Sequence, residues 1–250
     1  MSISRQPDDT TCGPTCLHAV YQYHQDDISL EAVVAEAPRL EGGGTLAVML
    51  GSHALKRGYE ATIYTYNLQV FDPTWFSPGA PPLASKLLAM SQNRVDRKLG
   101  SATRAYVEYL ALGGKIRFED LTAELLRKYL KRGMPVLTGL SSTFLYRAAR
   151  EIAGSSEADD VRGSPAGHFV VLSGYRETTR EVRVNDPWHP NPVSKGGTYW
   201  VTMSRLVNSI LLGILTYDAN LLIIEKKTDG KGPARGRQKD DSRANPRRRQ

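Results

Sequence analysis

Two cysteines, Cys12 and Cys16, are the only ones in 250 residues, and both lie in a segment that begins like a helix. Pro14 fits the first turn of a helix, because the N–H groups there have no intrahelical partners. Apolar side chains then recur at helical spacing: Leu17, Val20 and Tyr21. We therefore expect a helix over about 12–24. A helix N-terminus carries partial positive charge and favours a thiolate, so this position makes Cys12 a candidate nucleophile.

The two cysteines do not read as a functional pair. They are one helical turn apart, so a disulfide between them would be strained, and they lack the two-residue spacing of redox and zinc motifs. His18 adds a third potential ligand, but no second pair of ligands occurs elsewhere in the chain. The pattern therefore predicts no metal or other cofactor. We expect Cys16 to be buried and inert, while for Cys12 the inert reading is the alternative to a nucleophile.

Length and composition favour one globular domain in a reducing compartment. A chain of 250 residues can enclose one sizeable core, and 40% hydrophobic with 24% charged residues is ordinary for a globular protein. Residues 1–11 are polar and have no signal-peptide character, and the longest apolar cluster, 210–215, is too short to span a bilayer. We expect a cytoplasmic protein without a membrane partner.

The net charge of +7 comes mainly from the C-terminal end of the chain. Residues 225–250 hold ten Lys or Arg against four Asp or Glu, which leaves the rest nearly neutral. This segment lacks aromatic residues and apolar periodicity, so we predict a domain over 1–225 and a basic disordered tail over 226–250. Nucleic-acid binding would depend on the tail alone, and the simpler interpretation is a solubilising extension.

Periodicity and turn residues predict a largely helical first half followed by strands. Thr45 is expected to cap the third helix, and 141–163 reads as a long polar insertion that could cover a site. The expected elements are a short helix over 29–37, a helix from Thr45 to Gly58, a strand over 61–66, three helices within 72–131 and a buried strand over 133–140.

A second chemical element lies far along the chain. His168 stands at the head of an apolar run over 167–175, and a charged turn leads into a second run over 182–187, which together predict a β-hairpin. With period-two alternation, Asp186 falls on the buried side together with Val182 and Val184. A carboxylate there can hold one imidazole nitrogen and leave the other free for proton transfer. Asp-Pro is also common at strand ends for reasons of turn geometry alone.

These motifs, in this order, resemble the papain-like cysteine peptidases of the bacteriocin-processing, double-glycine leader peptidase family. The resemblance covers roughly residues 5–225, with gaps at 72–115 and 141–165. It implies an α+β fold in which an N-terminal helical part carries the nucleophile and packs on an antiparallel sheet carrying His and Asp. The motifs are Gln6, Cys12-Gly13, Gly167-His168-Phe169-Val170-Val171 and Asn185-Asp186-Pro187.

The resemblance also implies a role for each matching residue. Cys12 would attack a carbonyl carbon and form an acyl-enzyme, and His168 would pair with the thiolate and protonate the leaving amine. Asp186 would orient His168, with Asn185 as the runner-up. Gln6 and the Cys12 backbone N–H would stabilise the oxyanion.

Members of that family usually precede membrane helices and an ATPase in an exporter, and neither occurs in this chain, so we expect a stand-alone enzyme acting on a peptide or another amide. Three alternatives remain at this stage: acyl transfer to an amine, a silent module that binds peptides, and nucleic-acid binding through the tail. We expect substrate contacts from 73–100 and 141–165, because specificity tends to lie on loops around a fixed scaffold.

Overall fold

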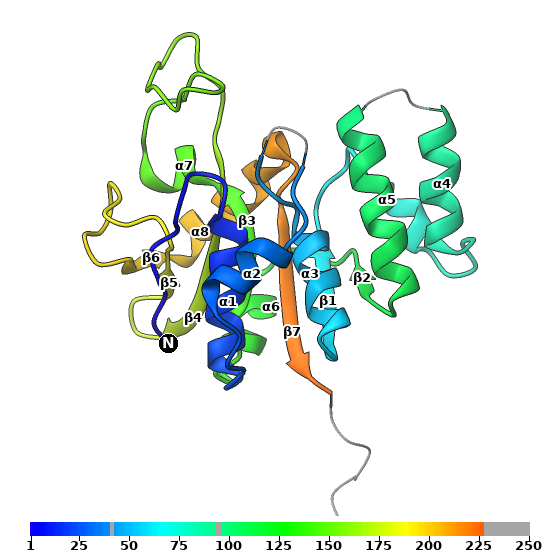
Figure 1. The fold of residues 1–250 in the computed structure, drawn as a ribbon, viewed down its shortest axis with the longest axis horizontal. Coiled ribbons are helices and arrows are strands. Elements are labelled where there is room, and N and C mark those ends of the chain that lie inside the picture. Colours follow the sequence, from blue (N-terminus) through cyan, green and yellow to red (C-terminus); the bar gives the residue numbers. More distant parts are fainter. Residues whose placement is uncertain (41–42, 94–96, 228–250) are drawn as a thin grey trace, which may run out of the picture.

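The computed structural model describes residues 1–40, 43–93 and 97–227, and within these ranges it contains one seven-stranded sheet (Figure 1). The strand order is β2-β1-β7-β3-β4-β5-β6. Neighbouring strands are antiparallel except β1 and β2, which run parallel, so the expected antiparallel sheet is correct apart from that edge. The strands are β1 (Tyr59–Thr65), β2 (Lys115–Arg117), β3 (Val136–Ser141), β4 (Gly167–Arg176), β5 (Glu181–Asn185), β6 (Thr198–Thr202) and β7 (Asn220–Lys226).

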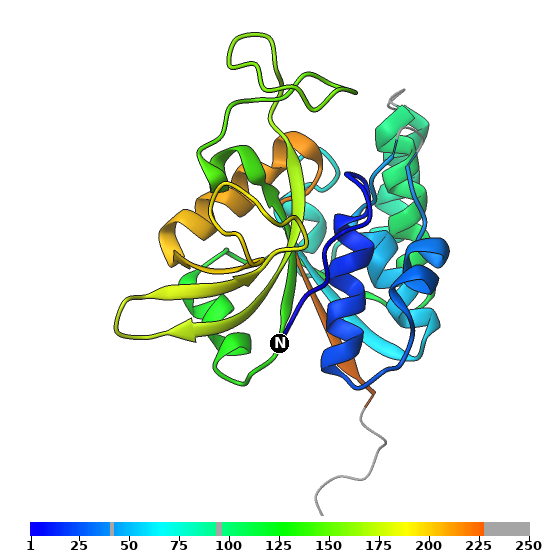
Figure 2. The same ribbon diagram turned by 60° about the vertical axis from the view of Figure 1, so that its left-hand side comes forward.

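Helices cover both faces of the sheet, with α1 and α3 on one side and α6 and α8 on the other (Figures 1 and 2). The structure is therefore mixed α+β, as the sequence predicts. The helices are α1 (Cys12–Tyr23), α2 (Leu30–Glu36), α3 (Ala47–Lys56), α4 (Leu83–Asn93), α5 (Arg97–Ala111), α6 (Ala123–Leu130), α7 (Ser142–Tyr146) and α8 (Met203–Leu212), with 3₁₀ turns η1 (Pro73–Phe76) and η2 (Gly213–Thr216).

Strand β4 shows how the sheet is buried on both faces. Successive side chains of a strand point to opposite sides. Phe169 and Val171 accordingly pack with α1 and α3 in one core, whereas Val170 and Leu172 pack with α6 and α8 in the other. A continuous apolar run, rather than alternation, is the sequence pattern of such a strand.

The N-terminal helix begins at Cys12, as predicted, and its first turn is packed against the sheet. Thr11 precedes it, and its hydroxyl donates to the Asp8 carbonyl at 3.0 Å. Gly13 allows a close approach, because a Cβ there would overlap the methyl group of Thr45. Cys16 is fully buried with its thiol 3.3 Å from the Phe169 carbonyl, and burial raises the pKa of that thiol well above its usual value. The expectation of a buried Cys16 is confirmed.

The predicted hairpin is formed by β4 and β5, with Leu172 opposite Val184 and a register shift between Leu172 and Gly174. His168 is the second residue of β4 and lies opposite Leu140 of β3. Asp186 directly follows β5. The hairpin thus brings the head of β4 and the end of β5 to the same end of the sheet.

One local prediction is wrong, and two short elements were not expected from the sequence. Thr45 does not cap a helix: α3 begins at Ala47, and the Thr45 hydroxyl instead donates to the Pro38 carbonyl at 2.9 Å. The segment 141–163 begins with the short helix α7, which a five-residue pattern is too short to reveal. Strand β2 was not predicted, because three residues carry no readable period.

The expected tail over 226–250 lies outside the described residues from 228 on. None of the described helices is long and apolar enough to cross a bilayer.

Candidate active site

The site lies where the N-terminus of α1 meets the head of β4. Cys12 is the first residue of α1 and is half-buried. It lines a pocket of about 200 Å³ together with His168 and Phe169 from β4 and Thr45 from the loop before α3. Residues 12 and 168 are therefore neighbours in space because α1 packs directly on β4.

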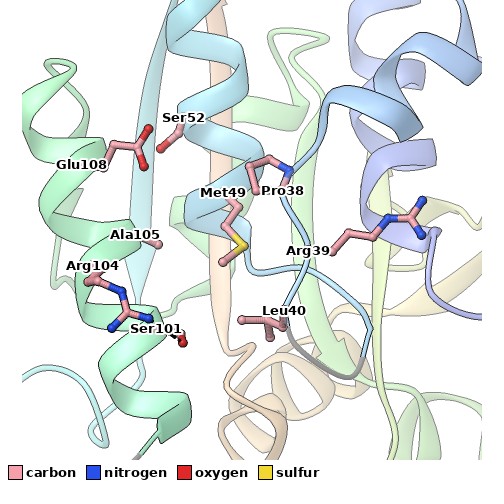
Figure 3. Close-up of a pocket in the computed structure, with 9 residues that line it drawn as sticks. All are labelled: Pro38, Arg39, Leu40, Met49, Ser52, Ser101, Arg104, Ala105 and Glu108. Atoms are coloured by element: carbon pink, nitrogen blue, oxygen red, sulfur yellow. Dashed lines mark hydrogen bonds between the residues drawn. The ribbon is translucent and has the colours of Figure 1, made fainter.

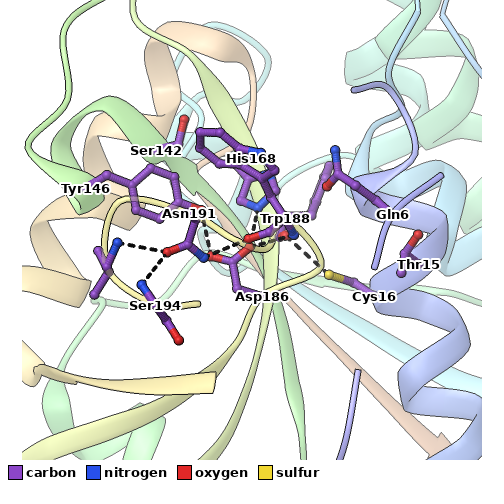
Figure 4. Close-up of polar contacts among 12 residues, drawn as sticks. Gln6, Thr15, Cys16, Ser142, Tyr146, His168, Asp186, Trp188, Asn191 and Ser194 are labelled. Atoms are coloured by element: carbon purple, nitrogen blue, oxygen red, sulfur yellow. Dashed lines mark hydrogen bonds and ion pairs between the residues drawn. The ribbon is translucent and has the colours of Figure 1, made fainter. Parts of the chain in front are cut away.

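His168 and Asp186 form a buried ion pair. Nε2 of His168 lies 2.8 Å from Oδ1 of Asp186, and the two residues are 7% and 0% exposed (Figure 4). Burial by itself disfavours the imidazolium, but the Asp186 carboxylate and then Cys12 outweigh it and raise the pKa of His168 to about 10. Since Nε2 faces Asp186, Nδ1 is the ring nitrogen left for Cys12. The structure thus brings together three of the residues that the sequence selected: Cys12, His168 and Asp186.

The Asp186 carboxylate is held by four donors. Oδ1 accepts from His168 and, at 3.0 Å, from the Trp188 backbone N–H; Oδ2 accepts from the hydroxyls of Tyr146 and Tyr199, both at 2.6 Å. Burial alone would raise the pKa of Asp186, but His168 and the two tyrosines hold it below its usual value. The carboxylate is thus ionised and fixed in orientation without contact with solvent.

Asn185, the runner-up orienting residue, faces the other side of the strand end, in agreement with the alternation of side chains. Its amide nitrogen donates to the Val171 carbonyl at 3.2 Å and to the Ser173 hydroxyl at 2.5 Å. The buried Asn185 side chain therefore supports the β4–β5 hairpin rather than His168.

Gln6 is tied to the segment that follows Asp186. Its backbone N–H donates to the Pro187 carbonyl at 2.8 Å, and its side-chain amide donates to the Asp8 carbonyl at 2.9 Å. It lines a second pocket, of about 330 Å³, with His168 and Trp188. The structure thus places Gln6 beside the His168–Asp186 pair, with one of its two amide hydrogens committed to Asp8.

The two pockets share three lining residues: Asp9, Gly167 and His168. The larger one is walled by residues of the polar insertion: Ala148, Ala149, Glu151, Ser156 and Ala158. Burial, together with the neighbouring Asp9, raises the pKa of Glu151 above its ordinary value. These residues of the insertion thus line the pocket beside His168, and the expectation that they contact substrate stays a prediction.

The other region expected to contact substrate, 73–100, contributes to neither pocket among the described residues. A separate pocket of about 300 Å³ lies between α3 and α5, where Met49 and Ser52 face Arg104 and Glu108 (Figure 3). It shares Leu40 with the Cys12 pocket but contains neither Cys12 nor His168. Within the described parts of the chain, no three His, Cys, Asp or Glu side chains gather as metal ligands.

Three residues of the site were missed by sequence reasoning: Tyr146, Trp188 and Tyr199. Trp188 could have been suspected from its place two residues after Asp186. No local signal marks the tyrosines, because they come from α7 and β6 and reach Asp186 only through the tertiary fold.

A half-buried thiol at a helix N-terminus, packed on a strand whose histidine pairs with a buried aspartate, is the architecture of a papain-like cysteine peptidase. The sequence comparison agrees, since residues 1–208 match the Peptidase_C39-like family. The chain belongs to this family and is a cysteine peptidase.

No curated protein sequence matches the chain. Solved structures to which it is similar include a double-glycine motif protease from an AMS/PCAT transporter in complex with the leader peptide, at 15% identity over 90% of this chain and 91% of that one, with a TM-score of 0.43. The peptidase domain of Streptococcus ComA, a bi-functional ABC transporter, is 12% identical over 90% of this chain and 98% of that one, with a TM-score of 0.42. Xylellain, a cysteine protease from Xylella fastidiosa, is 15% identical over 91% of this chain and 84% of that one, with a TM-score of 0.41.

Proposed function

We propose that this protein hydrolyses a peptide bond through an acyl-enzyme on Cys12, with His168 and Asp186 completing the catalytic triad and Gln6 contributing to the oxyanion hole. The observation that carries the proposal is that Cys12 and His168 line one pocket while His168 is paired with the buried Asp186, whose carboxylate raises the pKa of His168. The peptide is the substrate class because the family is one of peptidases.

In the first step the Cys12 thiolate attacks the carbonyl carbon, and electrons move onto the carbonyl oxygen. The C–N bond then breaks, and the His168 imidazolium gives its Nδ1 proton to the leaving amine. In the second step neutral His168 takes a proton from water, which attacks the thioester and releases the carboxylic acid and the thiolate. Asp186 keeps Nε2 protonated throughout.

The oxyanion needs donors beside Cys12. The Cys12 backbone N–H belongs to the first turn of α1, where N–H groups lack intrahelical acceptors. A primary amide has two hydrogens, so Gln6 can give its second one to the oxyanion while the first stays on Asp8. Losing one such donor typically costs about 100-fold in rate.

The proposal is tested by incubating the protein with a diverse peptide library and identifying new termini by mass spectrometry. Wild type is expected to cleave a subset of peptides, and Cys12→Ala to lose cleavage by at least about 1000-fold, because no other nucleophile replaces the thiolate. Cys16→Ala is the matched control and should retain activity. Cleavage by Cys12→Ala would refute the proposal, and amide products formed only with an added amine would indicate acyl transfer instead.

We further place the catalytic domain at residues 1–225, as the sequence predicts. Its support is the position of β7, which lies between β1 and β3 inside the sheet and ends at Lys226, one residue past that boundary.

A further inference from the structure

The two tyrosines on Asp186 are not part of the Cys–His–Asp–Gln set, yet their hydroxyls converge on one oxygen. Tyr146 ends α7, and Tyr199 lies on β6 opposite Val184 of β5. Both hydroxyls are 2.6 Å from Oδ2, and the residues are each 7% exposed. Two buried donors from separate elements aimed at a single carboxylate oxygen exceed what filling a core requires.

We propose that Tyr146 and Tyr199 are positioning residues that clamp Oδ2 of Asp186, so that Oδ1 is held against His168 and the imidazolium next to Cys12 is maintained. The inference rests on the proposed triad and assigns the residues that keep it in working geometry.

The geometry divides the carboxylate into two halves. Oδ1 takes the His168 ring and the Trp188 N–H, and Oδ2 takes only the tyrosines among the described contacts. Without the tyrosine hydroxyls, Oδ2 would be a buried anionic oxygen lacking donors, which is strongly unfavourable. The carboxylate would relieve this by rotating or by binding a proton, and either change weakens its hold on His168.

The tyrosines are suited to this task because they stay neutral. Burial, and then the charge of Asp186, raise the pKa of both phenols far above their ordinary value, so each stays a protonated donor near neutral pH. A hydroxyl that cannot ionise cannot turn into a competing anion beside Asp186.

Tyr146 is itself held in place from two sides. Its ring contacts the Trp188 ring edge-on, with centroids 5.3 Å apart. The carbonyls of the preceding residues, Phe144 and Leu145, accept hydrogen bonds from Arg205 of α8 at 2.7 and 3.1 Å. The residue after Tyr146 begins the segment that walls the larger pocket, so the clamp joins the cleft wall to the triad.

The test measures alkylation of Cys12 by iodoacetamide as a function of pH, which needs no knowledge of the substrate. A weaker imidazolium stabilises the thiolate less, so the midpoint of reactivity moves to higher pH. Tyr146→Phe combined with Tyr199→Phe is expected to move it upward by about one pH unit, or roughly tenfold in rate below the midpoint, whereas each single variant should lose about threefold or less. The double loss should exceed the product of the single losses, since one hydroxyl still holds Oδ2 in each single variant.

The matched control is Tyr64→Phe, which removes the buried Tyr64–Tyr129 hydrogen bond of 2.8 Å away from the site. It should lower thermal stability without moving the midpoint. In an Asp186→Asn background, Tyr146→Phe should add no further shift, because the charge it serves is gone. This cycle needs no variant that lacks both tyrosine hydroxyls, so it remains decisive if the tyrosine double variant fails to fold.

The possible outcomes distinguish the tyrosine clamp from the proposed triad. An upward shift that vanishes in the Asp186→Asn background supports the clamp. Tyrosine variants that lose stability but keep the wild-type midpoint, while Asp186→Asn shifts it, overturn the clamp and leave the triad intact. Labelling of Cys12 no faster than that of buried Cys16 in wild type overturns both.

Discussion

At the scale of single residues, the site depends on burial that is compensated by pairing. His168 and Asp186 are both charged and almost without contact with solvent, an arrangement that is unfavourable unless each charge is matched and hydrogen-bonded. Asp186 meets this condition with four donors. Removing one partner should therefore cost more than the pair contributes, because it leaves a buried charge behind.

The raised pKa of His168 predicts a specific pH dependence of stability. Its pKa is about 10 in the folded protein and about 6.5 when unfolded, so its contribution is complete below pH 6.5 and is lost as the pH rises through 10. We expect the free energy of unfolding to fall between pH 7 and 10, measured by urea denaturation. Asp186→Asn should flatten this slope, because it removes the main cause of the raised pKa. An equal slope in both proteins would contradict the assignment.

At the scale of elements, the head of β4 sets the position of His168. Gly167, the first residue of β4, packs against η2 and the residues after it: a Cβ at this position would overlap the Asp218 carboxylate and lie 2.6 Å from the Thr216 hydroxyl. The absence of a side chain therefore lets β4 begin directly beside this turn. Because His168 directly follows Gly167, this contact also fixes the position of the His168 imidazole.

Gly167→Ala is expected to displace the start of β4 and lower peptidase activity at least about tenfold, with a loss of stability of about 1–3 kcal/mol from overpacking. Gly174→Ala is the matched control on the same strand, since its Cβ would meet its nearest neighbour, Arg183, at an ordinary 3.5 Å. The control should change stability by about 0.5 kcal/mol or less. Equal effects of the two changes, by thermal melting and activity, would refute the role of Gly167.

At the scale of the whole molecule, the last described strand, β7, lies inside the sheet rather than at an edge. Strand β7 pairs with β1 on one side and β3 on the other, so the half of the sheet beside α3 and α5 is joined to the catalytic half by the final described element. The sheet is therefore complete only when β7 is present.

A chain ending at Lys227 is expected to keep the wild-type melting temperature and activity, because it retains β7. A chain ending at Asp218 should fail to fold, since β1 and β3 would lose their common neighbour. Circular dichroism melting distinguishes the two. The Lys227 truncation should also weaken any retention on a polyanionic column, because residues 228–250 hold eight Lys or Arg against three Asp and so carry five of the seven net positive charges. Undiminished retention of the truncated chain would contradict this prediction.

The local signals of the chain were enough for the outline of the site. A proline in a first helical turn placed Cys12 at the start of α1, and period-two alternation put Asp186 and Asn185 on opposite sides of β5. These predictions succeeded because they depend on backbone geometry between near neighbours. The prediction that Thr45 caps a helix was wrong because its hydroxyl donates to the Pro38 carbonyl instead. A pattern of helical spacing cannot reveal that contact.

What the sequence by itself determined is thus the family, the position of the candidate nucleophile Cys12 at the start of a helix, and the hairpin that carries His168 and Asp186. Only the tertiary structure decided that β7 lies between β1 and β3, that residues 148–158 wall the cleft, and that Tyr146 and Tyr199 meet on one oxygen of Asp186. The physical reason is that such contacts join elements far apart in the chain. They are set by the packing of both faces of the sheet together. Such packing leaves no repeating pattern of apolar residues in any single segment.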